Sequence, residues 1–379
     1  MAPIQNITRE SKAVMKRIGA GLVTTLFAVW SAHVSAHHSA APHYDLEKQI
    51  ELKGTVTQFR FVNPHSYVYF DVVDANGSKT PWRCELAAAT MLSRLGWALD
   101  MFPIGQTITI KGAPARREAN VCMLTSFVRS DGVEIFRESN VARLYTNRPA
   151  PARAVVTTRP ARASDGHINL AGLWVAAAGM RGGPPGPPPG GPGGPRGPGG
   201  PGGNVKLTEA GAAASKQYDS RFDNPALQCK PENIFFAWTH DNHVNEIIQT
   251  TDTITLKYGY MDVVRTVFMN AKHPAQITAS NLGHSIGSWD GDTLVVDTVG
   301  FEPGLLMVPA GAMHSNQLHT VERFTLDPAT MMLTRSYTAG DPLNLREPFT
   351  GQEKMKVSEE AATPYNCVEL SGKNNIRTR

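Results

Sequence analysis

The sequence predicts an all-β protein of two modules: an OB-like five-stranded barrel with one short helix, then a lipocalin-like antiparallel β barrel or meander. Short segments in which apolar and polar residues alternate recur in both halves of the chain, with turn residues between them. In the second half, these segments follow one another without a helical crossover. Consecutive strands there should therefore pair antiparallel, which favours a meander or a closed barrel.

The amino-terminal segment has the pattern of a secretory signal peptide. Four basic residues precede an apolar run of about 13 residues, and "SAHVSA" ends at Ala36 with small residues at the cleavage positions. The run is too short for a spanning helix, which needs about 20 residues. We therefore expect cleavage after Ala36, a periplasmic or secreted protein, and no stable membrane anchor afterwards. The expected ranges are a signal peptide at 1–36, the OB-like domain at 37–137, a linker at 138–164 and the second β domain at 165–379.

The charge of the chain gives no indication of a nucleic-acid partner. The whole sequence holds 37 Lys and Arg against 33 Asp and Glu, but the leader accounts for four basic residues and one acidic residue. The processed chain would therefore carry 33 basic and 32 acidic residues. A nearly neutral exported protein is not expected to bind nucleic acid or an anionic membrane through its net charge.

The first module has the element order of an OB-like barrel. "ELKGTVTQFRFV" (51–62) and "SYVYFDVVD" (66–74) read as strands, and the turn "NG" leads into a third at 79–87. A short helix is expected at 88–97, followed by strands in "QTITIKGAPA" and "NVCMLTSFVRS". Three strands, a helix and two strands fit the OB pattern.

The second module begins at "INLAGLW" and is interrupted near its start. Residues 181–204 are almost entirely Gly and Pro and are expected to be a disordered insertion, because they cannot bury a core. A short helix is predicted in "LTEAGAAASKQYD". Strands are predicted in "EIIQTTDTITLKYGY", "VVRTVFMN", "HSIGSWDGDTLVVDTVGF", "HTVERFTLD" and "MMLTRSYTAGD".

Four cysteines follow the leader, and an even number in an exported chain indicates disulfides. Two bonds allow three connectivities. The domain division favours Cys84–Cys122 and Cys229–Cys367.

Both modules resemble uncharacterised exported proteins. "HHSAAPHYD", "LKGTVTQFRFVNPHSYVYFDV" and "ELAAATMLSRLGW" are similar to an uncharacterised family of secreted bacterial proteins with a His-His mature amino terminus, over roughly residues 37–137. "LQCKP", "GHSIGSWDGDTLVVDTVGF" and "HSNQLHTVERF" resemble a second uncharacterised exported β module. These resemblances imply export and domain boundaries, and they bring no settled activity.

The segment "HHSAAPHYD" is the first candidate site. Cleavage after Ala36 would make His37 the first residue, so its amine and imidazole could chelate one ion. His38, His43 or His65 could complete the nitrogen set that Cu(II) prefers, and Asp45 could orient a ligating ring. The predicted metal ligands are therefore His37, His38, His43 and His65, with copper as the expected metal. The alternative is a polar terminus without a ligand.

A second candidate cluster lies in the second module and comprises His284, His314, His319, Glu322 and Arg323. Alternation places His319, Val321 and Arg323 on one face of their strand and Thr320, Glu322 and Phe324 on the other. A ligand site would use His284, His314, His319 and Arg323. An acid–base site would use His284, His314, His319 and Glu322. A structural hydrogen-bond network is the third interpretation.

Two weaker candidates are interpreted as structural. His240 and His243 have a spacing that suits a metal only within a helix, and their neighbours read as loop. Five aromatic residues of the first module could line an OB binding face, but core packing explains them better: Phe59, Phe61, Tyr67, Tyr69 and Phe70.

We therefore expect an exported binding protein for a small ligand, with a copper-type metal site at its mature amino terminus. The alternatives are a periplasmic enzyme that uses the acid–base histidines of the second module, and a structural or envelope-interaction protein without a ligand. The ligand, the oligomeric state and the role of the Gly/Pro insertion stay open.

Overall fold

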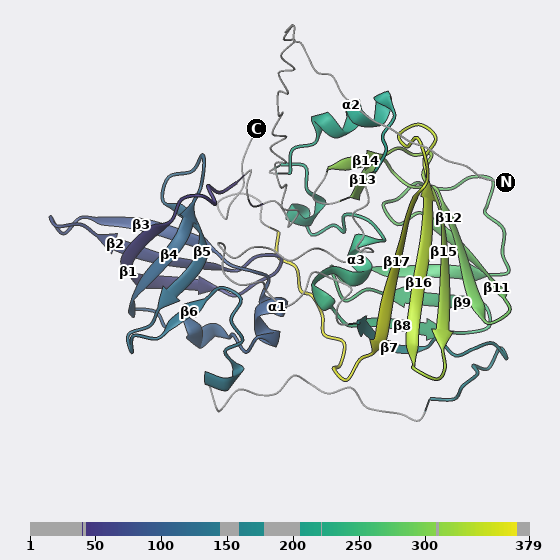
Figure 1. The fold of residues 1–379 in the computed structure, drawn as a ribbon, viewed down its shortest axis with the longest axis horizontal. Coiled ribbons are helices and arrows are strands. Elements are labelled where there is room, and N and C mark those ends of the chain that lie inside the picture. The colour runs from purple at the N-terminus through teal and green to yellow at the C-terminus, as the bar shows by residue number, and fades with distance from the viewer. Residues whose placement is uncertain are drawn as a thin grey trace, which may run out of the picture. The chain divides into compact units, whose positions relative to one another are not determined.

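A computed structural model describes residues 40, 43–144, 159–177, 205–220, 222–307 and 311–369. The predicted leader, His37, His38 and the Gly/Pro insertion at 181–204 lie outside these residues. The described chain is mostly strand and forms two closed barrels, so the all-β prediction is confirmed (Figure 1).

The first barrel has the predicted order of three strands, a helix and two strands. Its strands are β1 (Ile50–Arg60), β2 (Tyr67–Val73), β3 (Lys79–Glu85), β4 (Thr107–Pro114), β5 (Val121–Val128) and β6 (Glu134–Phe136). Its helices are α1 (Ala89–Arg94) and the 3₁₀ turns η1 (Leu99–Met101) and η2 (Ala142–Leu144). The sheet runs β3-β2-β1-β4-β5-β6, and a parallel β3–β5 pairing closes five strands into an OB-like barrel. The short β6 is an addition that the sequence did not predict.

The core of the first barrel explains the period-two pattern of its strands. Val68, Phe70, Ile110 and Phe127 are fully buried, so every second residue of these strands points inward. Phe59 is buried in the same core, whereas Tyr67 is buried on the other face of β2, with its hydroxyl 3.3 Å from Glu85.

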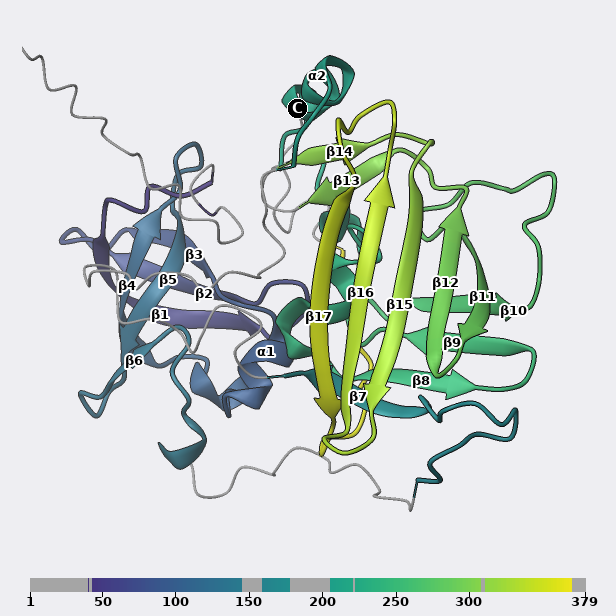
Figure 2. The same cartoon turned by 45° about the vertical axis from the view of Figure 1, so that its right-hand side comes forward.

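The second barrel has nine strands (Figure 2). They are β7 (Gly172–Ala176), β8 (Asn245–Gln249), β9 (Thr253–Lys257), β10 (Val264–Met269), β11 (His284–Asp290), β12 (Thr293–Val299), β15 (His319–Asp327), β16 (Met332–Gly340) and β17 (Phe349–Val357). The pairing order is β10-β11-β12-β15-β16-β17-β7-β8-β9, closed on itself. A separate hairpin comprises β13 (Gly304–Met307) and β14 (Ala312–His314). The helical elements are α2 (Glu209–Gln217), η3 (Pro225–Gln228), α3 (Phe236–Thr239) and η4 (His240–Asn242).

One pairing of the second barrel departs from the antiparallel expectation. β10 and β11 are parallel, with Val267 opposite Ser285, because residues 270–283 return the chain to the end at which β10 began. All other neighbours in this barrel are antiparallel.

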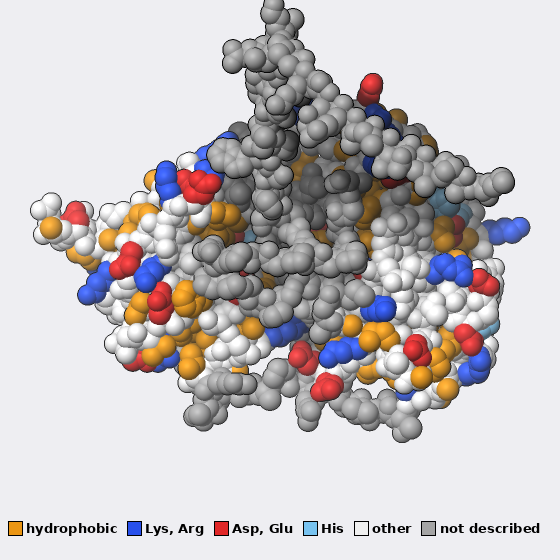
Figure 3. Space-filling view, in the orientation of Figure 1, with side chains coloured by type: hydrophobic (Ala, Val, Ile, Leu, Met, Phe, Trp, Pro, Cys, Tyr) orange, Lys and Arg blue, Asp and Glu red, His pale blue; other side chains and the backbone are white. Residues whose placement is uncertain are grey.

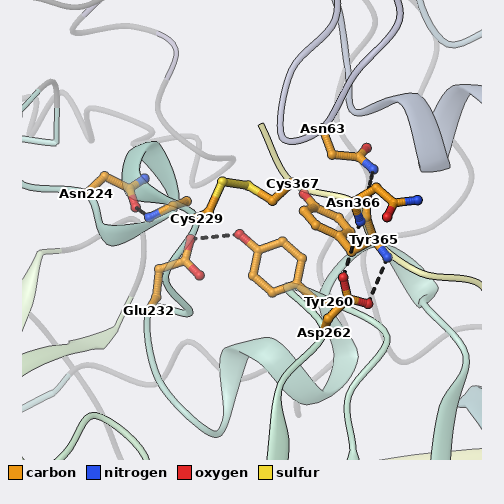
Figure 4. The surroundings of a disulfide bond; sticks show 10 residues. Asn63, Asn224, Cys229, Glu232, Tyr260, Asp262, Tyr365, Asn366 and Cys367 are labelled. Atoms are coloured by element: carbon orange, nitrogen blue, oxygen red, sulfur yellow. Dashed lines mark hydrogen bonds between the residues drawn. A yellow bond between two sulfur atoms is a disulfide. The ribbon is translucent and has the colours of Figure 1, made fainter. Parts of the chain in front are cut away.

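Both cysteine pairs favoured by the domain division are disulfides, Cys84–Cys122 and Cys229–Cys367. The first joins the parallel strands β3 and β5. The second ties the carboxy-terminal segment to η3, next to a hydrogen bond of 3.1 Å from the Tyr260 hydroxyl to Glu232 (Figure 4). The backbone N–H of Tyr365 donates to Asp262 at 2.8 Å, which fixes the same segment.

The surface charges agree with the near-neutral balance of the sequence. On the face drawn in Figure 3, acidic and basic side chains of the described residues are interspersed. Within the described part of the chain, no helix is long and apolar enough to cross a membrane.

Candidate functional site

In the first barrel, one carboxylate links His65 to the amino-terminal segment. Glu85 is the last residue of β3 and lies opposite Tyr67 of β2. Its Oε1 is 2.5 Å from Nδ1 of His65, which lies in the loop between β1 and β2. Its Oε2 accepts a hydrogen bond of 2.7 Å from the hydroxyl of Tyr44. Tyr44 is almost fully buried and pairs with Ala115 just beyond β4, so residues next to it are held beside the barrel.

The charge of Glu85 is stabilised by these partners. Burial alone would raise the pKa of its carboxyl group, but His65 and the Tyr44 hydroxyl outweigh this effect and lower the pKa to about 2. The side chain of His65 is 46% exposed, and its Nδ1 faces Glu85.

The other predicted residues of this site have different outcomes. His43 is described, and its carbonyl oxygen accepts from the backbone N–H of Arg116 at 2.8 Å. Asp45 forms ion pairs with Lys48 at 3.2 Å and with Arg116 at 3.4 Å, so it is engaged by cations rather than by an imidazole. Glu85, and not Asp45, is the carboxylate that orients an imidazole here, namely that of His65.

In the second barrel, three imidazoles and one carboxylate form a continuous chain on the outer face. Nε2 of His319 lies 2.8 Å from Oδ2 of Asp297, and Nε2 of His273 lies 2.9 Å from Oδ1 of the same carboxylate. Nδ1 of His273 is in turn 2.9 Å from Nδ1 of His284. We call His273, His284, Asp297 and His319 the outer histidine cluster.

Strand register brings this cluster together. β12 lies between β11 and β15, and Asp297 is paired with Ile286 on one side and Val321 on the other. His284 and His319 lie on these neighbouring strands, two residues from Asp297's partners, and therefore point to the same face. His273 comes from the loop that connects β10 with β11. The ring of His284 also stacks on Phe268 of β10, with centroids 5.4 Å apart.

The interior of the same barrel holds a buried ionic network. Oε1 of Glu322 accepts from Arg335 at 2.7 Å, its Oε2 contacts Arg265, and Arg335 also donates to Glu353 at 3.0 Å. Burial would raise the pKa of Glu322, but Arg265 and Arg335 outweigh it and hold that pKa below its ordinary value. All four side chains are 6% exposed or less, so we call them the inner ionic network.

Aromatic side chains surround this network. The guanidinium of Arg335 lies 5.4 Å from the ring centroid of Phe235 and 5.8 Å from that of Trp238, in and beside α3. Its Nη2 also donates to the carbonyl oxygen of Ile234 at 3.1 Å. The residues around α3 thus take interior space in which a lipocalin-like barrel would hold a ligand. The small-ligand pocket stays a prediction.

The predicted cluster of the second module is therefore divided. His284 and His319 share the outer cluster, whereas Glu322 points inward. His314 is buried, with Nδ1 3.0 Å from the carbonyl oxygen of Ser315, and burial lowers its pKa. Arg323 is paired with Asp290 at the surface at 2.6 Å. The structure does not bring His284, His314 and Glu322 to one cleft.

His240 and His243 are structural in their surroundings. Both are buried in or beside the short η4, with the His240 ring 4.3 Å from that of Tyr260 and the His243 ring 5.2 Å from that of Tyr365.

Sequence reasoning missed His273, Asp297, Glu85 and the two interior arginines. His273 lies in a loop without periodicity, and only strand pairing reveals its partners. Arg335 could have been noticed as a charged residue at an inward position of its strand, where burial demands a partner.

Among the described residues, no three His, Cys, Asp or Glu side chains stand ready around one point for a metal ion. At the first barrel, the described residues supply one oriented imidazole beside the His-rich segment. In the outer histidine cluster, the imidazole nitrogens and the carboxylate oxygens are hydrogen-bonded to one another.

These features define a disulfide-bonded protein of two β barrels, with oriented histidines on each. Residues 26–123, about a quarter of the chain, match a family of unknown function (DUF6152). This match agrees with the expectation of an uncharacterised domain in the first module. No curated protein and no solved structure matches the chain.

Proposed function

We propose that this is an exported protein that binds a transition-metal ion, Cu(II) foremost, at the amino-terminal side of its first barrel. The observation that carries the proposal is that Glu85 holds both His65 and Tyr44. The two disulfides support export, since such bonds persist in oxidising compartments.

Glu85 gives His65 the character of a metal ligand. An imidazole whose Nδ1–H is donated to a carboxylate keeps the lone pair on Nε2 and becomes more basic there. Such carboxylate–histidine pairs commonly orient metal-bound histidines. The His65 side chain is 46% exposed, so the ring that Glu85 orients reaches the surface.

Tyr44 holds the chain that directly follows the predicted nitrogen donors at the same carboxylate as His65. Its hydroxyl is bound to the same carboxylate, and His43 precedes it directly. Ala40, the first described residue, is three residues after His37, a span of at most about 11 Å of extended chain. Processing after Ala36 would add the amine and imidazole of His37, which gives the nitrogen-rich set that Cu(II) prefers.

The test is a Cu(II) titration of protein secreted to the periplasm, with the amino terminus established by intact mass. The background carries H273Q, H284F and H319Q, so that the second barrel contributes no imidazole of the outer histidine cluster. We expect one ion with EPR parameters of several nitrogen donors. H65Q should weaken binding at least about 10-fold, and so should one extra residue before His37.

The matched control is H167Q, which changes a histidine stacked on Trp289 of the second barrel, 4.6 Å between centroids. Its affinity should equal that of the background. Equal affinity in H65Q and in the extended chain would overturn the proposal, because neither the oriented ring nor the new amine would then be a ligand.

A further inference from the structure

The outer histidine cluster joins three imidazoles and one carboxylate, although the fold gains little stability from them. Three of its side chains are partly exposed, His273 at 21%, Asp297 at 36% and His319 at 51%. Ion pairs with this exposure contribute little to stability. The cluster nevertheless places two imidazole nitrogens on the two oxygens of one carboxylate.

Hydrogen bonds already hold the candidate ligand atoms of the cluster close to one another. Zinc ligands lie about 2.0–2.2 Å from the metal in a tetrahedral arrangement, so two ligand atoms are about 3.4 Å apart. The observed separations from Asp297 are 2.9 Å to His273 and 2.8 Å to His319. Protons now join these atoms, and a cation could take their place.

We propose that the outer face of the second barrel binds a divalent transition-metal ion, Zn²⁺ in the first instance, through His273, Asp297 and His319. Two imidazoles and a carboxylate are a borderline donor set that suits zinc and leaves a position open for water or a small anionic ligand. This site is separate from the one proposed on the first barrel.

The side chains of His273, Asp297 and His319 must move slightly before they can surround an ion. His273 and His319 face different oxygens of Asp297, consistent with the absence of a preformed ligand set among the described residues. Because all three side chains reach solvent, they can turn about their side-chain bonds without disturbing the barrel core. Strands β12 and β15 and the loop before β11 keep the ligand atoms close together.

His284 is a positioning residue in this arrangement. A metal on Nε2 of His273 requires the proton of that ring to be on Nδ1. Nδ1 of His284, 2.9 Å away, can accept that proton's hydrogen bond when its own proton is on Nε2. His284 thereby selects the ring orientation and tautomer of His273. Its stacking on Phe268 holds the ring in place.

The experiment is zinc titration calorimetry on the full processed chain, with histidine ring ¹⁵N NMR to locate the ion. We expect H319Q and D297N each to lose one zinc equivalent and to keep the wild-type circular dichroism spectrum. H284F keeps a ring against Phe268 but removes the acceptor, and should bind zinc about 10-fold more weakly. Zinc should shift the Nε2 signals of His273 and His319.

Two controls separate this site from other histidines. H167Q should bind as wild type does. H65Q should lose at most the first-barrel equivalent and keep the ring shifts of His273 and His319. The proposal is overturned if H319Q and D297N retain wild-type stoichiometry and affinity, or if the Nε2 signals of His273 and His319 do not move. Either result is independent of the outcome of the Cu(II) experiment on His65.

Discussion

Replacing Glu322 by Gln should severely destabilise the second barrel. The carboxylate is fully buried between Arg265 and Arg335, and the one other acid of the inner ionic network is Glu353. The amide keeps the shape of the side chain but leaves two buried guanidinium groups with one carboxylate. Removing one partner of a buried ion pair costs about 3–5 kcal/mol, because the charge left behind is no longer compensated.

The assay is thermal and urea unfolding, followed by circular dichroism. For a domain of about 200 residues, this loss corresponds to a fall in Tm of roughly 6–20 °C. The surface variant D290N removes the exposed partner of Arg323 and should change stability by less than about 0.5 kcal/mol. It therefore serves as the matched control for loss of an acidic residue on the same barrel.

A double variant tests the physical reason directly. Adding R265M to E322Q removes the excess positive charge, so the double variant should recover part of the loss, with a coupling of about 1–3 kcal/mol. Additive losses, or a loss of less than about 1 kcal/mol in E322Q alone, would refute the view that uncompensated charge dominates this interior.

The remaining predictions concern pH, the disulfide and a helix cap. Because folding lowers the pKa of Glu322, its ionised carboxylate stabilises the fold fully above the unfolded pKa of 4.5, and this stabilisation is lost as the pH falls through the folded pKa. The difference in unfolding free energy between wild type and E322Q should therefore become smaller below pH 4.5, measured by urea unfolding at a series of acidic pH values. The variant C229S/C367S opens a loop with a sequence separation of 138 and should lose about 5 kcal/mol by the chain-entropy model, measured by urea unfolding with C84S/C122S for comparison. The Thr208 hydroxyl accepts from the N–H of Gly211 at 3.0 Å, so T208A should cost about 0.5–2 kcal/mol, and T208S should restore most of it.

The first barrel could be predicted in detail because nearly all of its strands bury one face. Phe70 and Ile110 alternate with more exposed neighbours, so the period-two pattern gives both the strands and their faces. β17 of the second barrel was not predicted. Its inward positions include Glu353, which is paired with Arg335, so a buried acid interrupts the apolar pattern. The parallel pairing of β10 and β11 could not be predicted either, because no local sequence pattern shows to which end of β10 the loop at 270–283 returns the chain.

The candidate sites illustrate what alternation can and cannot determine. The alternation of side chains along "HTVERF" predicts that His319 and Glu322 point to opposite faces of their strand. The structure confirms that Glu322 faces the interior while His319 is exposed. His319 and Glu322 therefore lie on opposite faces of β15. Parity could not supply His273, whose position depends on a loop. The two faces of β15 are thus separate systems: substitutions at His319 should alter ion binding with little effect on unfolding, and those at Glu322 should do the reverse.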